Sequence, residues 1–480
     1  MGGVRGVDTE GPIYGTVGYQ APEIGTDGPS VSSDLYTVAR ALAVLTFEFK
    51  GYQSTYKFTF PDGVPLLEQQ ESFARLLRRA THRDPGRRFG SAGEMAEQLT
   101  GVLREVLATA DGVPRPAFST VFTPELHAIG VELAGGDELA GAGVHFAAPA
   151  GAEIIAGLPM PQVDRADPAA GYLATLAGLD PAQRAAALVG ADSGDAAVPA
   201  EVATSPERRL ALARAQLDVG DHAGARHTLA ALAAEEPSDW RIAWTDGLRL
   251  LALTDAGAPT AATGAFGAVY DELPGELAPK LALAFAAEAA GDAATAGRYF
   301  RLVWTVDRSA ISAAFGLARA CLATGDRPGA IAALAAVPDT SSYHAAAQIA
   351  AVRILVSSGT TGDDLRQAGG RLGRLPLDEA RRQQLTVEIL RAALGWAADG
   401  QAPQGQTPQG QTPPGQAQGS ARTPARVSGD GLILGCEPNE RSLRFGLERG
   451  YRALARLTSD RGRRIELVDM ANAVRPKTWS

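Results

Sequence analysis

Three groups of residues in this chain are of types that could do chemistry, but their spacing argues against each. A phosphate-binding loop needs glycines at set intervals after a strand, whereas GGVRGVDTEG, residues 2–11, has other intervals and follows no strand. The six histidines lack metal-ligand spacing, and His222 and His227 face different sides of a helix. Cys321 occupies an apolar helix position, which favours a core side chain over a nucleophile. We therefore expect no phosphate loop and no metal site here.

A fourth group, the stretch GTVGYQAPEI at residues 15–24, carries a more specific pattern. In eukaryotic-type protein kinases the activation segment ends in G-T-x-x-Y-x-A-P-E, and residues 15–24 resemble that pattern. The resemblance implies that the segment forms the peptide-substrate side of a kinase site. The residues concerned are Gly15, Thr16, Gly18, Tyr19, Ala21, Pro22 and Glu23. In the family pattern the Thr16 hydroxyl contacts catalytic residues and is no clear phosphorylation site.

Two further motifs follow in the order that kinases use. SSDLYTVARAL, residues 32–42, resembles the start of the central kinase helix, whose aspartate, matched by Asp34, anchors the backbone of the catalytic loop. RDPGRRF, residues 83–89, resembles the R-D-P-x-x-R-F signature. Its arginine, matched by Arg88, forms a buried ion pair with the glutamate matched by Glu23. Three motifs in this order are a specific signal, and the alternative is a turn and two helices whose resemblance is accidental.

The parts of a kinase that perform phosphoryl transfer are absent from the sequence. Transfer needs a Gly-rich loop, a strand lysine paired with a helix glutamate, a catalytic-loop Asp and Asn, and a D-x-G aspartate on Mg²⁺. THRD, residues 81–84, contains H-R-D but lies downstream of A-P-E. MGG, residues 1–3, resembles the end of D-x-G, which would place Met1 one residue after the metal-binding aspartate. We therefore expect an N-terminally truncated kinase chain that is inactive alone, with no catalytic residue of its own.

Two helices must support these motifs. Residues 34–49 are apolar on nearly every side, which predicts a buried central helix. Residues 91–107 are amphipathic and begin with Ser91 and Glu94 at capping-box spacing. Residues 1–110 are therefore expected to form the C-terminal part of a kinase domain, from the activation segment on.

The next region, residues 111–200, reads as an extended linker. GVPRPAFSTVF, residues 112–122, is predicted to be extended because each proline restrains itself and the residue before it. The remainder has no sustained helical period, apart from a short helix expected near residues 167–179.

From residue 201 to the end, alanine-rich helix pairs repeat. Glycines recur at spacings of 37, 34 and 34, namely Gly220, Gly257, Gly291 and Gly325. Five positions after each stands a small residue, and nine positions after each a larger apolar one: Ala225, Ala262, Ala296 and Ala330, then Leu229, Phe266, Phe300 and Leu334. This pattern resembles the tetratricopeptide repeat, whose period is about 34 residues. The alternative is a generic alanine-rich helical bundle.

An insertion interrupts this repeat domain. Residues 399–424 are rich in Gln, Pro and Gly and almost devoid of charge and apolar bulk, so they are expected to be disordered. Residues 441–458 look helical again, which makes the tract an insertion within a helical domain.

Composition limits the class of protein. The net charge is -9 and the pI about 5.4, which argues against a nucleic-acid-binding surface. The two cysteines cannot make a disulfide framework and stand in no C-x-x-C pair, so a reducing cytoplasm is the expected compartment. No run approaches the roughly 18 apolar residues of a membrane span, and no signal peptide is seen.

Taken together, the motifs and repeats resemble bacterial protein kinase G, a family of serine/threonine kinases with a C-terminal tetratricopeptide domain. The segments LLRRA, QLTGVLREV, PGELAPKLALA, ISAAFGLARA and LVDMANAVRP also look like that family. The resemblance implies ATP and Mg²⁺ for the complete enzyme, with none bound by this chain alone. It also implies protein substrates, among them small forkhead-associated regulators of nitrogen metabolism, dimerisation through the repeat domain, and a rubredoxin-like module and ATP-binding half upstream.

The expected fold is therefore mainly α: a partial, helical kinase C-lobe followed by a tetratricopeptide-repeat α-solenoid. The expected function is that of a serine/threonine protein kinase by family, which transfers the ATP γ-phosphoryl group to Ser or Thr of proteins. The alternative is a non-catalytic tetratricopeptide interaction or scaffold protein that carries a kinase remnant.

Overall fold

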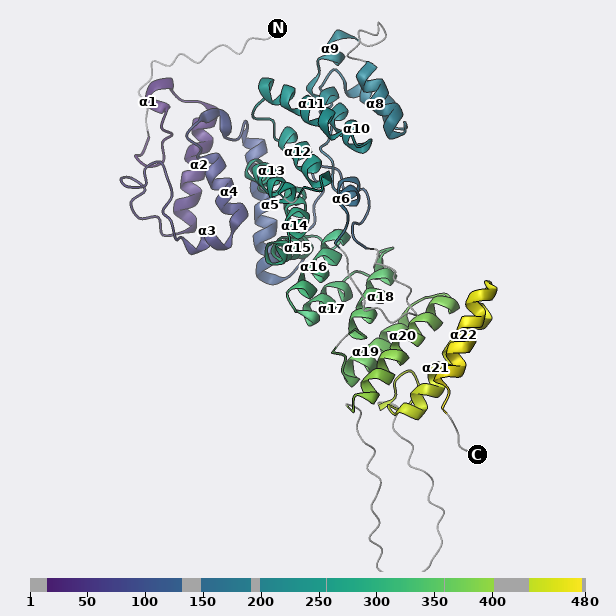
Figure 1. Ribbon diagram of the computed structural model, residues 1–480. Coiled ribbons are helices and arrows are strands. Elements are labelled where there is room, and N and C mark those ends of the chain that lie inside the picture. The colour runs from purple at the N-terminus through teal and green to yellow at the C-terminus, as the bar shows by residue number, and fades with distance from the viewer. Residues whose placement is uncertain are drawn as a thin grey trace, which may run out of the picture. The chain divides into compact units, whose positions relative to one another are not determined.

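A computed structural model describes residues 15–131, 148–190, 199–255, 257–357, 359–400 and 431–476 (Figure 1). Across these ranges the regular structure is α-helical apart from one 3-10 helix, and β-pairing is limited to two isolated bridges. The mainly α fold class is thus confirmed. The chain divides into two compact units, the first with residues up to 130 and from 148 to 320, the second with residues from 321 onward.

The first unit begins with a cluster of helices around its own core. These are α1 (Ile24–Asp27), α2 (Val31–Thr46), α3 (Pro65–Gln69), α4 (Glu71–Ala80), the 3-10 helix η1 (Pro85–Arg87) and α5 (Ala92–Asp111). Leu35 and Ala39 of α2 pack with Leu76 of α4 and Met95 of α5 in this core. One face of each longer helix is therefore apolar and buried against the others.

The helix expected at residues 34–49 is α2, which starts three residues earlier. Ser30 caps it, because its hydroxyl accepts from the Ser33 N–H while the Ser33 hydroxyl accepts from the Ser30 N–H. The expectation of burial on nearly every side is wrong. Val31, Val38 and Leu45 are 61%, 53% and 83% exposed. These three lie seven residues apart, so they form one apolar stripe on a helix that is buried on its other faces only.

The helix expected at residues 91–107 is α5, which runs four residues further. The Ser91 hydroxyl accepts from the Glu94 N–H at 3.1 Å, as the spacing predicts. The Glu94 carboxylate, however, accepts from the Gly90 N–H at 2.8 Å and also pairs with Arg79 of α4. The cap therefore ties the start of α5 to α4 as well as satisfying its first N–H groups.

Residues 113–203 contain more helix than expected. Beside α7 (Ala170–Leu176), which lies within the range expected for a short helix, there are α6 (Gly151–Gly157), α8 (Pro181–Gly190) and α9 (Ala200–Ala203). Residues 113–130 are non-helical, as the prolines predict, and Phe122 forms an isolated bridge with Pro161. The short lengths of α6 and α7, seven residues each, explain why no sustained period was visible.

Antiparallel helix pairs make up the rest of the first unit, and α5 runs beside them (Figure 1). They are α10 (Pro206–Asp218), α11 (His222–Glu235), α12 (Trp240–Ala252), α13 (Ala258–Glu272), α14 (Ala278–Ala289) and α15 (Ala293–Val306), followed by α16 (Ile311–Ala323). The repeated small residues Ala225, Ala262 and Ala296 are fully buried. Phe266 and Phe300 are fully buried too. Small residues thus let paired helices approach, and large ones fill the space between them.

Three of the four repeat glycines share one turn geometry. Gly220, Gly291 and Gly325 have φ of 80°, 79° and 80°, a left-handed conformation that favours glycine. Gly257 differs: its φ is -89° and it precedes α13 directly. The second repeat therefore keeps the glycine without the left-handed turn.

The second unit continues with helices packed around its own core. They are α17 (Arg327–Ala335), α18 (His344–Leu355), α19 (Gly362–Arg374), α20 (Glu379–Ala398), α21 (Glu440–Leu457) and α22 (Arg461–Val474). Its core includes Val352, Leu372, Leu390 and Leu447. The helix expected after the insertion is α21. Apart from its first two residues, the Gln/Pro/Gly tract lies outside the described residues, as do residues 1–3 and the glycines of residues 2–11.

None of the described helices is both long enough and apolar enough to cross a membrane.

Candidate functional site

The segment expected to form the peptide side of a kinase site, residues 15–24, is a tight turn against α2. The Tyr19 N–H donates to the Thr16 carbonyl at 3.2 Å, which closes the turn. Gly18 sits in it with φ of 95°, and a Cβ there would lie 2.7 Å from the Tyr52 carbonyl oxygen. Only glycine fits, because both the backbone angle and the space exclude a side chain. The residues of the motif differ in exposure. Gly15 and Thr16 are exposed, Tyr19 and Pro22 are half-buried, and Gly18 and Ala21 are buried.

Arg40 of α2 holds this turn, and sequence reasoning missed it. Its guanidinium is fully buried and donates to the carbonyls of Gly18 at 2.9 Å and of Tyr56 and Thr59 at 2.8 Å. It also lies 4.6 Å from the centre of the Phe49 ring. Burial lowers the pKa of Arg40, whose hydrogen-bond acceptors among the described residues are backbone carbonyls.

The charge of Arg40 is thus balanced by backbone carbonyls, where a buried arginine often has a carboxylate. Each of the carbonyls that Arg40 binds belongs to a loop, so one side chain sets the position of two loops relative to α2. The available signal was an arginine inside an otherwise apolar helix, because a charge in that setting needs buried acceptors.

Glu23 and Arg88, which the motifs predicted to pair, are brought together. Arg88 Nη1 lies 2.6 Å from Glu23 Oε1, and Nη2 lies 2.8 Å from Oε2. The Arg88 side chain is fully buried, and its Nε donates to the His82 carbonyl at 2.6 Å. The hydrogen bond from Arg88 lowers the pKa of Glu23. This two-pronged pair joins the end of the turn to the loop after α4.

Asp34, expected to anchor a catalytic loop, has no such partner in the part of the chain that the structure describes. Its carboxylate is exposed and accepts no hydrogen bond from any described residue. The Thr16 side chain is exposed in the same way. Their roles in the kinase pattern remain predictions.

A second polar cluster, also missed from the sequence, joins α4 and α5 to the repeats. The Lys280 ammonium lies 2.8 Å from Glu105 Oε2, and the lysine side chain is fully buried. Ser72 donates to the Glu105 carboxylate at 2.7 Å and accepts from the Tyr270 hydroxyl at 2.6 Å. Burial raises the pKa of Tyr270. We call Ser72, Glu105, Tyr270 and Lys280 the buried cluster. It has every polar partner that a desolvated ion pair requires.

Charged side chains surround the buried cluster. Arg75 lies over the Tyr270 ring at 4.2 Å and pairs with Glu71 at 2.8 Å. Glu71 also pairs with Arg298 at 2.5 Å and accepts from the Tyr299 hydroxyl at 3.0 Å. Arg75 and Glu71 of α4 thereby link this helix to Tyr270 of α13 and to α15.

At the other edge of this contact two backbones touch. A Cβ on Gly101 of α5 would lie 2.3 Å from the Gly275 carbonyl oxygen, and a Cβ on Gly275 would lie 2.4 Å from the Gln98 carbonyl oxygen. The Gly275 N–H donates to the Gln98 side chain at 2.8 Å. Helices α4 and α5 and the repeats are therefore one packed body within the first unit.

Residues 113–130 are fastened to the repeats by polar contacts. Glu125 accepts from the Ser312 hydroxyl at 2.6 Å, and the same hydroxyl accepts from the Ile129 N–H at 2.8 Å. The second Glu125 oxygen has no hydrogen-bond partner among the residues that the structure describes. Burial raises the pKa of Glu125 to about 7. Arg319 donates to the Gly130 carbonyl at 2.8 Å and completes this attachment.

The remaining candidates from the sequence are the cysteines and possible metal ligands. Cys321 and Cys436 are both buried, and burial raises the pKa of Cys436. Within the described ranges, no three His, Cys, Asp or Glu side chains gather as ligands for a metal ion.

Comparison with known proteins identifies the family to which the chain is similar. A family model described as the protein kinase G tetratricopeptide repeat matches residues 116–478. The chain is similar to the serine/threonine-protein kinase PknG of Mycolicibacterium smegmatis, at 39% identity over 99% of this chain and 60% of that protein. It is also similar to the PknG of Mycobacterium leprae, at 39% identity over 99% of this chain and 59% of that protein. The chain thus spans about three fifths of the length of these relatives.

Proposed function

Because this chain belongs to the protein kinase G tetratricopeptide repeat family, we propose that it supplies two parts of a serine/threonine protein kinase. One is the peptide-substrate side of the site, residues 15–24, which we call the floor, and the other is the repeat domain. The complete enzyme would transfer the γ-phosphoryl group of ATP to a Ser or Thr hydroxyl of a protein substrate. The observation that carries the proposal is the Glu23–Arg88 pair, which holds the A-P-E segment in the manner its motif implies.

The exposed stripe of α2 gives further support. Val31, Val38 and Leu45 present apolar side chains on the helix that also carries Asp34. Exposed apolar faces of this kind commonly mark an interaction surface. A catalytic half that packs on this stripe would cover the apolar side chains and bring its catalytic loop to the Asp34 carboxylate.

The chain's own residues do not fit ATP or Mg²⁺. In the part of the chain that the structure describes, no acidic cluster of metal-ligand geometry exists, and the sequence lacks the kinase lysine, aspartates and asparagine. We assign no step through the nucleotide to this chain. It contributes by positioning the floor: Arg40 binds the Gly18 carbonyl, and Arg88 binds the Glu23 carboxylate at the end of the turn. A substrate peptide would lie on the exposed side, over Gly15 and Thr16. The chain alone is proposed to be inactive.

Phosphoryl transfer provides the test. We would compare the chain with a chimera that places, ahead of Met1, the part of the M. smegmatis relative that precedes its aligned residues. With radiolabelled ATP and a generic Ser/Thr substrate, the chimera should incorporate label and the chain alone should not. Loss of a positioned catalytic base alone costs roughly 10²–10⁴-fold.

Matched variants of the chimera examine the floor. Arg88→Gln should reduce transfer strongly, whereas Arg87→Gln, which removes an exposed charge next to it, should leave transfer within twofold. Label incorporated by the chain alone would refute the proposal. A folded chimera that transfers nothing would favour the alternative, a non-catalytic tetratricopeptide scaffold.

A further inference from the structure

The last helical pair of the second unit carries a charge opposite to that of the whole chain. Residues 440–475 contain nine arginines and five carboxylates, a net charge of +4, whereas the chain has a net charge of -9. Helices α21 and α22 form most of this segment and pack against each other. A local reversal of charge on one hairpin indicates a surface that attracts anions.

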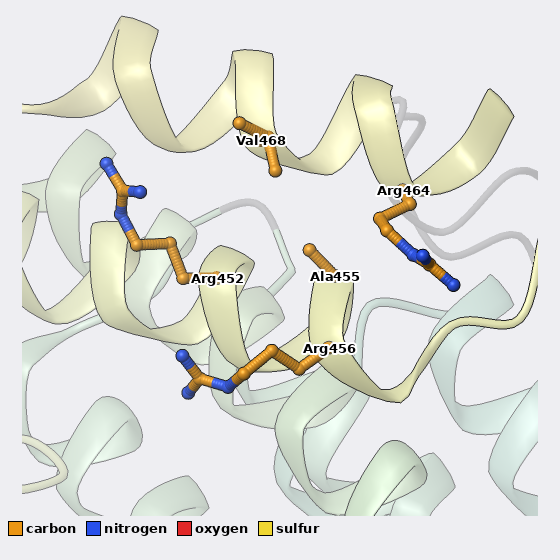
Figure 2. Close-up of a pocket in the computed structure, with 5 residues that line it drawn as sticks. All are labelled: Arg452, Ala455, Arg456, Arg464 and Val468. Atoms are coloured by element: carbon orange, nitrogen blue, oxygen red, sulfur yellow. The ribbon is translucent and has the colours of Figure 1, made fainter. Parts of the chain in front are cut away.

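Three of the nine arginines line one opening between these helices. Figure 2 shows Arg452, Ala455 and Arg456 on one helix and Arg464 and Val468 on the other. Ala455 and Val468 point toward each other, whereas the three arginine side chains lie around them and point in different directions. The opening is a cleft of about 460 Å³. Ala455 and Val468 lie between the arginines, so the cleft has an apolar middle and a basic rim. Among the described residues that line it there is no carboxylate.

The three arginines differ in what they already bind. Arg464 donates to the Thr458 carbonyl at 2.9 Å and so caps the end of α21. Arg452 pairs with Glu448 at 3.1 Å and donates to Asn472. Arg456 is exposed and makes no hydrogen bond or ion pair with any described residue. Two arginines are thus held in place by the protein, while the donors of Arg456 remain available to a ligand.

The surroundings of the cleft limit the size of the anion. Asp460, Glu466 and Asp469 are exposed on or next to α22. A long polyanion laid across the hairpin would meet these carboxylates, whose repulsion opposes its binding. A compact anion with several oxygens would meet only the arginines. Guanidinium groups match phosphate in charge and in hydrogen-bond geometry.

We propose that the cleft between α21 and α22 binds the phosphate monoester of a phosphorylated Ser or Thr in a peptide. Arg456 would supply its donors to the phosphate oxygens, and Arg452 and Arg464 would contribute charge from the rim. Ala455 and Val468 would contact the apolar part of the phosphorylated side chain. The inference rests on this cleft alone and does not depend on the proposed kinase activity.

Fluorescence anisotropy with the full chain tests it. The probes are a labelled phosphothreonine peptide with alanine and glycine neighbours, its unphosphorylated twin, and a twin with glutamate in place of phosphothreonine. The phosphopeptide should bind at least tenfold more tightly than either twin. Binding should weaken as salt is raised, because charge attraction contributes to it. Excess inorganic phosphate should displace the phosphopeptide, whereas failure of this competition would contradict the proposed contact.

Two variants locate the binding. Arg456→Gln should lower the affinity for the phosphopeptide at least fivefold. It should not lower the unfolding temperature, because Arg456 has no partner to lose among the described residues. Arg441→Gln removes an exposed arginine of the same helix outside the cleft and should change binding less than twofold. Equal losses in both variants, equal binding of all three peptides, or no binding at all would overturn the proposal.

Discussion

The helices of residues 15–111 and the repeats of residues 206–306 are packed into one unit but are held together by different means. The repeats rely on small apolar residues at a fixed period, such as Ala262 and Ala296, which are fully buried. The N-terminal helices rely in addition on buried arginines, Arg40 and Arg88, that bind loops far away in sequence. Periodic packing spreads stability over many equivalent contacts. Polar anchors concentrate it in a few residues that cannot be exchanged.

The strongest test of this difference removes one polar anchor. Glu23→Ala should lower the free energy of unfolding of the first unit by about 3–5 kcal/mol, because it leaves the buried Arg88 guanidinium without its carboxylate. Urea unfolding followed by circular dichroism measures the loss. Asp27→Ala, which removes an exposed carboxylate four residues on, should cost less than about 0.5 kcal/mol. Equal effects of the two variants would show that the pair is no anchor.

A second test uses pH on the polar attachment of residues 113–130. The pKa of Glu125 is about 7 in the fold against an ordinary 4.5, so between these values the folded state keeps a proton that the unfolded state has lost. Stability must therefore fall as pH rises through this window, by up to about 3 kcal/mol. Glu125→Gln should abolish that fall, so that the variant exceeds the natural protein in stability at pH 8 and roughly equals it at pH 4.5.

The control for Glu125→Gln is Glu201→Gln, which changes an exposed glutamate. Its unfolding curve should follow that of the natural protein at both pH values. A Glu125→Gln variant with the pH dependence of the natural protein would mean that the carboxyl is ionised within the fold.

The third test addresses the periodic packing. Ala296→Leu should overpack the contact of α15 with its neighbours and cost about 1–3 kcal/mol. Ala294→Leu, on the exposed side of the same helix, should change stability by less than about 0.5 kcal/mol. Thermal unfolding compares the two. If they behave alike, the repeat register assigned from the glycine spacing is wrong.

The features that could be predicted from the sequence also differ between the periodic repeats and the N-terminal helices. The period of the repeats identified Ala225, Ala262 and Ala296, because a recurring core position leaves a recurring signal. The motif order indicated the Glu23–Arg88 pair, because kinases share it. The arginine itself stood out in an apolar helix, but the carbonyls that Arg40 binds left no signal, since backbone carbonyls accept hydrogen bonds whatever side chains their residues carry. Glu105 and Lys280 are separated by 175 positions and have no common pattern.

The error on α2 has a physical cause of its own. Apolar residues on nearly every side of a helix indicate that each side can be buried, but not which partner buries it. Leu45 and Val38 remain exposed on the described surface, although their spacing is that of a packed face. The helical content of residues 151–190 was underestimated for another reason: helices of seven to ten residues are too short to establish a period.

The contact between Gly101 and Gly275 determines how this protein can be dissected. A gene fragment that starts at residue 201 would follow the apparent boundary in the sequence, yet it would discard α5 and expose the backbone of the turn that Gln98 covers. It would also leave the ammonium of Lys280 desolvated and without Glu105. Fragments for isolated study of the repeats should therefore retain α4 and α5, because the working module begins upstream of the first repeat.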